Sequence, residues 1–194
     1  VQASRDHRRI AIDKVGVKGL RYPLALFDAQ GRVQHTVAEV SLAVGLPPEV
    51  KGTHMSRFVE LLEKKRPALT GERLLGMLDE MLRRLDADSG EIELAFPYFV
   101  SKEAPVSGVE SLLDYDVRLR AEKRPGRPAG LLMTVVAPVT SLCPCSKKIS
   151  DYGAHDQRSR VTIRVELLQP VEWHELVRFA EDQASGELWP MLKR

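Results

Sequence analysis

The sequence has only two cysteines, few aromatic residues and no long apolar run. Cys143 and Cys145 flank Pro144, a spacing that would strain a disulfide between them. We therefore expect free thiols and a reducing compartment. No stretch reaches the roughly 18 consecutive apolar residues of a membrane span, and residues 1–9 lack the apolar segment of a signal peptide. These absences predict a cytoplasmic protein with no membrane partner.

An excess of one charge is also absent. The 194 residues carry 29 Lys and Arg against 27 Asp and Glu, with both signs interspersed and a formal net charge of +2. A dedicated nucleic-acid binder concentrates basic charge, so we expect no nucleic-acid partner. Apolar residues make up 43% of the chain, which is enough for a sizeable core. The composition predicts a globular chain of one large domain or two small ones.

Hydrophobic periodicity predicts a repeating order of strands and helices. Strand patterns are found at 17–27, 33–46, 91–100, 111–120, 131–139 and 159–168. Helical spacing of apolar residues is found at 58–62, 74–85 and 171–185. Gly31 lies in the turn of the first strand pair, Pro67 and Gly71 separate the first two helices, and the Pro- and Gly-rich stretch 122–130 is the best linker candidate. The order β-β-α-α-β-β, then β-β-α, predicts an α+β fold with helices on one face of an antiparallel sheet.

A polar excursion at residues 141–158, between two apolar strands, is the first candidate site. Cys143 and His155 stand near its two ends, where a thiolate and an imidazole can converge on one ion. A structural zinc site needs four protein ligands, whereas a catalytic site keeps an open position in which the metal lowers the pKa of water toward about 7. We favour Cys143 as the ligand, with Cys145 packed behind it. The alternative is two buried, inert thiols and a histidine hydrogen-bonded within a loop.

Residues 51–57, directly before a predicted helix, are the second candidate site. Backbone N–H groups at a helix start, together with Lys51, Ser56 and Arg57, suit a phosphate, and His54 can transfer a proton. The alternative is an ordinary helix cap with a solvated basic turn.

The chain resembles the type IB GTP cyclohydrolase family in several strings that follow one another in order over nearly its whole length. These strings are KGTHMSRF (51–58), APVSG (104–108), SLLDYD (111–116), PVTSLCPCSK (138–147), ISDYGAH (149–155), QRS (157–159) and the closing LKR. The resemblance implies a tunnelling fold, in which tandem β-β-α-α-β-β units assemble between subunits into a barrel. It also implies a homotetramer with active sites at the subunit interfaces. The first unit would span 1–128, and an incomplete second unit 129–194.

The same resemblance implies a metal site and a reaction. In this family the metal is held by the first cysteine of Cys-Pro-Cys and the histidine of Gly-Ala-His. These two residues correspond to Cys143 and His155 in this chain. A glutamate expected beyond Arg194 would be the third ligand of a zinc, manganese or iron ion. GTP would be hydrolysed at C8 of guanine, losing formate and giving 7,8-dihydroneopterin triphosphate, the entry to folate-type pterins. Ser146 and Lys147, beside the thiols, are further candidates for substrate contacts.

Three other functions remain open at this point. A relative with the same fold would convert GTP to a cyclic phosphate, which product analysis would reveal. A catalytically silent module would bind metal or assemble without turnover. A thiol-redox protein would use Cys143 and Cys145, although Pro144 and the strained spacing argue against it.

Overall fold

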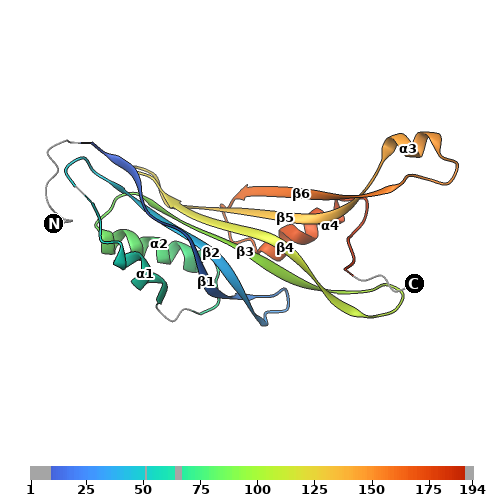
Figure 1. Cartoon of the computed structure of the whole chain (residues 1–194), viewed down its shortest axis with the longest axis horizontal. Coiled ribbons are helices and arrows are strands. Elements are labelled where there is room, and N and C mark those ends of the chain that lie inside the picture. Colours follow the sequence, from blue (N-terminus) through green and yellow to red (C-terminus); the bar gives the residue numbers. More distant parts are fainter. Residues whose placement is uncertain (1–9, 51, 64–66, 191–194) are drawn as a thin grey trace. The chain divides into compact units, whose positions relative to one another are not determined.

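The computed structural model describes residues 10–50, 52–63 and 67–190 (Figure 1). Its strands are β1 (Ile12–Phe27), β2 (Val33–Leu46), β3 (Gly90–Glu103), β4 (Glu110–Lys123), β5 (Gly130–Leu142) and β6 (Asp156–Glu166). Its helices are α1 (Ser56–Glu63), α2 (Gly71–Leu85), α3 (Pro144–Ile149) and α4 (Trp173–Asp182). None of the helices in these ranges is long and apolar enough to cross a membrane.

The six strands form one sheet in which each strand neighbours the next along the chain, in the order β1-β2-β3-β4-β5-β6. β1 pairs antiparallel with β2, and β2 with β3, so that Leu42 lies opposite Val17 on one side and Ile92 on the other. Short connections between neighbouring strands are typical of antiparallel pairing. The prediction of an α+β fold with an antiparallel sheet is confirmed.

The predicted strands and helices are all present, and three details differ. β1 begins five residues earlier than predicted, because register shifts between Ile12 and Val15 and between Val17 and Leu20 break the alternation there. Helix α3 was not predicted, because none of its residues is buried and no apolar period marks it. The expected linker at 122–130 instead connects two neighbouring strands of one sheet, β4 and β5. The division into fold units 1–128 and 129–194 stays a prediction.

The chain divides into two compact units, of which the first comprises residues 1–96, 118–133 and 166–170. In this unit α1 and α2 lie on the same side of β1 and β2 (Figure 1). Thr70 caps the start of α2 by accepting a hydrogen bond from the N–H of Arg73. A Cβ at Gly90 of β3 would lie too close to the carbonyl oxygen of Ala43 in β2 and to Leu82 in α2, so α2 packs closely on the sheet.

The second unit comprises residues 97–117, 134–165 and 171–194. Its helix α4 begins with a capping box in which Glu172 and Glu175 each accept a hydrogen bond from the other's backbone N–H. Trp173, only 1% exposed, packs edge-on against Tyr98 of β3, with ring centroids 6.1 Å apart. Val177 of α4 is also buried. α4 thereby anchors the second unit, which contains the 141–158 excursion.

Candidate functional site

The loop between β5 and β6 carries the two predicted metal ligands at its ends. Cys143 follows β5 directly and is the N-cap residue of α3, with Pro144 at the first helical turn, where its lack of an N–H costs nothing. His155 directly precedes β6. The two residues thus stand where the paired strands leave and re-enter the sheet.

Hydrogen bonds join the two ends of this loop. The N–H of Cys143 donates to the carbonyl oxygen of His155, with 3.3 Å between the two atoms. The hydroxyl of Ser146 donates to the carbonyl oxygen of Cys143 and accepts from the N–H of His155, both at 3.1 Å. The structure therefore brings together three residues predicted for the site, and Ser146 bridges the other two through their backbones.

The thiols at this site are free and accessible. Cys143 is half-buried and Cys145 exposed. Neither the expected packing of Cys145 behind Cys143 nor the alternative of two buried, inert thiols therefore describes this loop. The backbone N–H of Ser146 is the main cause that lowers the pKa of the Cys143 thiol, because it hydrogen-bonds the charged form, and Cys145 adds to the effect. A thiol with a lowered pKa more readily supplies the thiolate that a metal binds. Together with the exposed imidazole of His155, this donor set fits a transition metal.

A third ligand is not found in the part of the chain that the structure describes. Within residues 10–50, 52–63 and 67–190, no group of three or more His, Cys, Asp and Glu side chains could hold a metal ion. The glutamate expected beyond Arg194 lies outside these ranges. The described site supplies two donors, and metal binding by Cys143 and His155 stays a prediction.

The second candidate site lies at the start of α1, in the first unit. Ser56 and Arg57 are the first two residues of the helix, and both are exposed, as is His54. The guanidinium of Arg57 donates to the carbonyl oxygen of Arg84 at the end of α2, at 2.7 Å. Arg57 therefore has a structural contact, in addition to any role toward a ligand. Lys51 lies outside the described residues, and Lys147 is exposed on α3.

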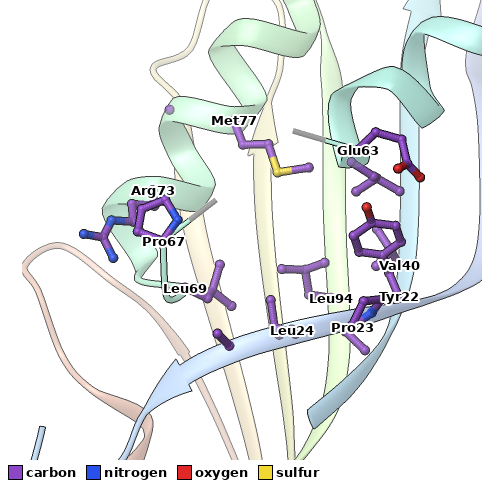
Figure 2. Close-up of a pocket in the computed structure, with 14 residues that line it drawn as sticks. Tyr22, Pro23, Leu24, Val40, Glu63, Pro67, Leu69, Arg73, Met77 and Leu94 are labelled. Atoms are coloured by element: carbon purple, nitrogen blue, oxygen red, sulfur yellow. The ribbon is translucent and has the colours of Figure 1, made fainter. Parts of the chain in front are cut away.

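A cavity of about 490 Å³ lies elsewhere in the first unit, between the β1–β2 hairpin and the helices α1 and α2 (Figure 2). Its walls are mostly apolar, and at one end the Tyr22 hydroxyl points toward the Glu63 carboxylate. Burial, and then the charge of Glu63, raise the pKa of Tyr22. None of the residues predicted for catalysis, metal or substrate lines this cavity.

Sequence analysis singled out Cys143 and His155, the two ends of the predicted metal loop (residues 143–155), but not the short helix α3 between them or the hydrogen bonds by which Ser146 joins them. Ser146 was expected to contact substrate, whereas its hydroxyl is engaged with the backbones of Cys143 and His155. One signal was available: Pro144, because proline is over-represented at the first position of a helix.

Comparison with known proteins supports the resemblance seen in the motifs. The sequence profile described as type I GTP cyclohydrolase folE2 matches residues 1–194. The chain is 62% identical over 194 residues to GTP cyclohydrolase FolE2 1 of Dechloromonas aromatica (strain RCB), covering 100% of this chain and 73% of that protein. It is 57% identical, over 100% of this chain and 72% of each relative, to GTP cyclohydrolase FolE2 2 of Cupriavidus metallidurans and GTP cyclohydrolase FolE2 of Burkholderia multivorans. The chain therefore belongs to the type I GTP cyclohydrolase FolE2 family.

Proposed function

We propose that this chain is a GTP cyclohydrolase that hydrolyses GTP to 7,8-dihydroneopterin triphosphate and formate, the first step of pterin and folate biosynthesis, with a divalent metal held by Cys143 and His155. Membership of the FolE2 family supports the activity. One observation supports the location: the backbones of Cys143 and His155 are joined directly and through the Ser146 hydroxyl. This arrangement keeps a soft thiolate and an imidazole at the same end of the sheet.

A divalent ion, zinc, manganese or iron, would supply a nucleophile at neutral pH by lowering the pKa of a bound water toward about 7. The protein residues have separate tasks. Cys143 offers a thiol whose pKa is already lowered by the N–H of Ser146, and His155 offers an imidazole nitrogen. The Ser146 bridge fixes the spacing of their backbones. His54, exposed before α1, is the proposed proton-transfer residue for ring opening.

The start of α1 is the proposed triphosphate site. Backbone N–H groups at a helix start and the exposed side chains of Ser56 and Arg57 favour an anion, and Lys51 would add a further cation. Lys147 on α3 is exposed next to the thiols and is proposed as a second basic contact.

We also propose a homotetramer with active sites at subunit interfaces, located in the cytoplasm. Three large apolar side chains around the metal loop are exposed: Leu142 by 43%, Ile149 by 88% and Tyr152 by 102%. Such a concentration of apolar surface is typical of an interface. The outer strands β1 and β6 end the sheet and present unpaired backbone groups that association can cover. The free thiols support a reducing compartment.

The experiment that tests the proposed function compares Cys143→Ala with Cys145→Ala in the full chain. Each protein is stripped with a chelator, reloaded with zinc, manganese or iron, and given GTP, and the products are separated by chromatography. We expect formate and 7,8-dihydroneopterin triphosphate from the wild type, no turnover from Cys143→Ala, and a milder loss from Cys145→Ala, because the backbone hydrogen bond from Cys143 to His155 places these two residues side by side. A cyclic phosphate product, turnover without metal, or equal losses in the two variants would contradict the proposal.

A further inference from the structure

A buried cluster of charges lies in the second unit, away from the proposed ligands. Lys102 of β3 is only 7% exposed, and Glu181 in the last turn of α4 is 8% exposed. The Lys102 ammonium lies 2.7 Å from a Glu181 carboxylate oxygen and 2.8 Å from a Glu187 carboxylate oxygen. It also lies 5.5 Å from the centre of the Trp189 ring, within the range of a cation–π contact.

The cluster is complete and is not a vacant binding site. The Lys102 ammonium lies within ion-pair distance of two carboxylates and within cation–π range of one aromatic ring, so its charge is already compensated. The Tyr115 hydroxyl of β4 donates to Glu181. Burial, and then Glu181, raise the pKa of Tyr115, so the hydroxyl keeps the proton that it donates. Burying such charges costs desolvation energy that apolar side chains would avoid, which suggests that the cluster fixes a specific geometry.

The geometry that it fixes is the path of the chain after α4. The three partners of Lys102 lie close together along the chain: Glu181 is in the last turn of α4, and Glu187 and Trp189 are on the segment that follows it. This segment, residues 185–189, runs beside the end of β5. The N–H of Thr140 donates to the carbonyl oxygen of Gly186 at 2.9 Å.

A second contact reaches the residue directly before the proposed metal ligand. The N–H of Leu142 donates to the Ser185 hydroxyl at 3.2 Å, and the Thr140 hydroxyl lies 3.4 Å from the carbonyl oxygen of Glu187. Cys143 follows Leu142, and its own N–H bonds the carbonyl oxygen of His155. A continuous series of contacts therefore leads from Lys102, through segment 185–189 and the end of β5, to Cys143.

We propose that Lys102 is a positioning residue for the metal site: by holding Glu187 and Trp189, it fixes segment 185–189 against the end of β5 and so orients Cys143 toward His155. Lys102 touches neither ligand. The proposal rests on the proposed function for the identity of the site. Its structural part, the link from Lys102 to the backbone of Cys143, does not depend on any metal.

The test uses Glu187→Ala in the full chain, because the Glu187 side chain is 41% exposed and its loss should leave the fold intact. Lys102→Met is less suitable, because it would leave the buried Glu181 carboxylate without its cation. Amide hydrogen exchange is measured without metal at Thr140, Leu142 and Cys143. We expect exchange there to become about tenfold faster, the effect of losing one hydrogen bond to a charged group. The Gly45 amide, which donates to Ser89 in the first unit, serves as the internal reference and should not change.

Metal affinity is the second measurement, made with zinc against a competing chelator. Glu187→Ala should bind zinc about tenfold more weakly than the wild type, a typical effect of losing a residue that supports a metal ligand. Glu187→Gln, which keeps an acceptor for Lys102, should recover part of this loss. Lys14→Met removes an ion pair of similar length, Lys14 to Glu91 at 2.7 Å in the first unit, and is the control that should change neither measurement.

The outcomes separate this inference from the proposed function. Faster exchange at Thr140 and Leu142 with an unchanged Cys143 amide would overturn the inference, as would unchanged exchange at all three. An equal loss of zinc affinity in Lys14→Met and Glu187→Ala would also overturn it, because the effect would then be one of general stability. If the wild type binds no zinc, the proposed metal site is wrong, and hydrogen exchange alone decides the positioning role.

Discussion

At the scale of single residues, the proposed chemistry depends on Ser146 as much as on the ligands. Its hydroxyl hydrogen-bonds to the backbones of both Cys143 and His155. Its N–H is the main cause of the lowered pKa of the Cys143 thiol. One residue thus controls both the spacing of the ligands and the charge of one of them.

Replacing Ser146 with Ala should loosen the site without unfolding the protein. The change removes both hydroxyl contacts but keeps the N–H, so we expect zinc affinity to fall about tenfold. The free energy of unfolding should fall by only about 1 kcal/mol. Chelator competition and thermal unfolding measure the two effects.

Ser150→Ala is the matched control for this change, because the Ser150 hydroxyl accepts a local hydrogen bond from the N–H of Tyr152 in the same loop, at 3.2 Å. It should leave zinc affinity as in the wild type. If the two variants lose affinity equally, the bridge has no special role.

Cys143 and His155 could be predicted from the sequence because thiol and imidazole side chains are rare, and because they stand at the two ends of one polar excursion. The bridge could not be predicted. It depends on a six-residue helix whose residues are all solvent-accessible, and such a helix leaves no apolar pattern.

At the scale of secondary structure, Arg57 contacts the end of one helix from the start of another. Its guanidinium satisfies the carbonyl oxygen of Arg84 in the last turn of α2, which would otherwise lack a partner within the helix. The sequence pattern suggested only a helix start with basic residues. The contact with α2 depends on tertiary packing, which no local pattern encodes.

Arg57→Ala distinguishes the phosphate role from the structural one. If Arg57 binds the triphosphate, GTP affinity should fall about 10- to 100-fold, corresponding to a charge-assisted contact of roughly 1.5 to 3 kcal/mol. Guanosine, which has no phosphates, should bind both proteins alike, and zinc affinity should not change. Isothermal titration measures all three.

The control for this experiment is Arg83→Ala, because Arg83 is exposed in the last turn of α2 and its guanidinium donates to the Asp79 carbonyl oxygen of the same helix. It should leave GTP affinity unchanged. If Arg57→Ala weakens guanosine binding as much as GTP binding, the residue shapes the fold, and the phosphate assignment is wrong.

Strands and helices were the most predictable part of the fold, because buried and exposed residues alternate regularly in β2, β4 and β5 and recur at helical spacing in α2. The start of β1 was less predictable. Gly19 has a φ of 72°, and the register shifts beside it disturb the alternation that identifies a strand.

At the scale of the whole molecule, the tunnelling fold and its assembly came from resemblance and not from pattern. Periodicity indicates that a sheet is covered by helices, but it does not indicate how sheets join between subunits. The exposed Ile149 and Tyr152 of the metal loop are the observation that favours association.

The oligomeric state is tested by light scattering at micromolar concentration. We expect a homotetramer for the wild type. Ile149→Lys together with Tyr152→Lys should shift it toward smaller species, because charges would replace apolar contacts. The matched control, Val33→Lys with Val37→Lys, alters exposed residues of β2, far from the metal loop along the chain. It should leave the oligomeric state unchanged. A monomeric wild type would contradict the proposed assembly.

The central claim, that Cys143 and His155 hold one catalytic metal, is tested most directly by X-ray absorption on the zinc-loaded full chain. We predict one sulfur neighbour at about 2.3 Å and imidazole nitrogen at about 2.0 to 2.1 Å. The sulfur should vanish in Cys143→Ala and remain in Cys145→Ala, and the imidazole scattering should fall in His155→Ala. A wild-type spectrum with only oxygen and nitrogen neighbours, or sulfur that persists in Cys143→Ala, would contradict the account.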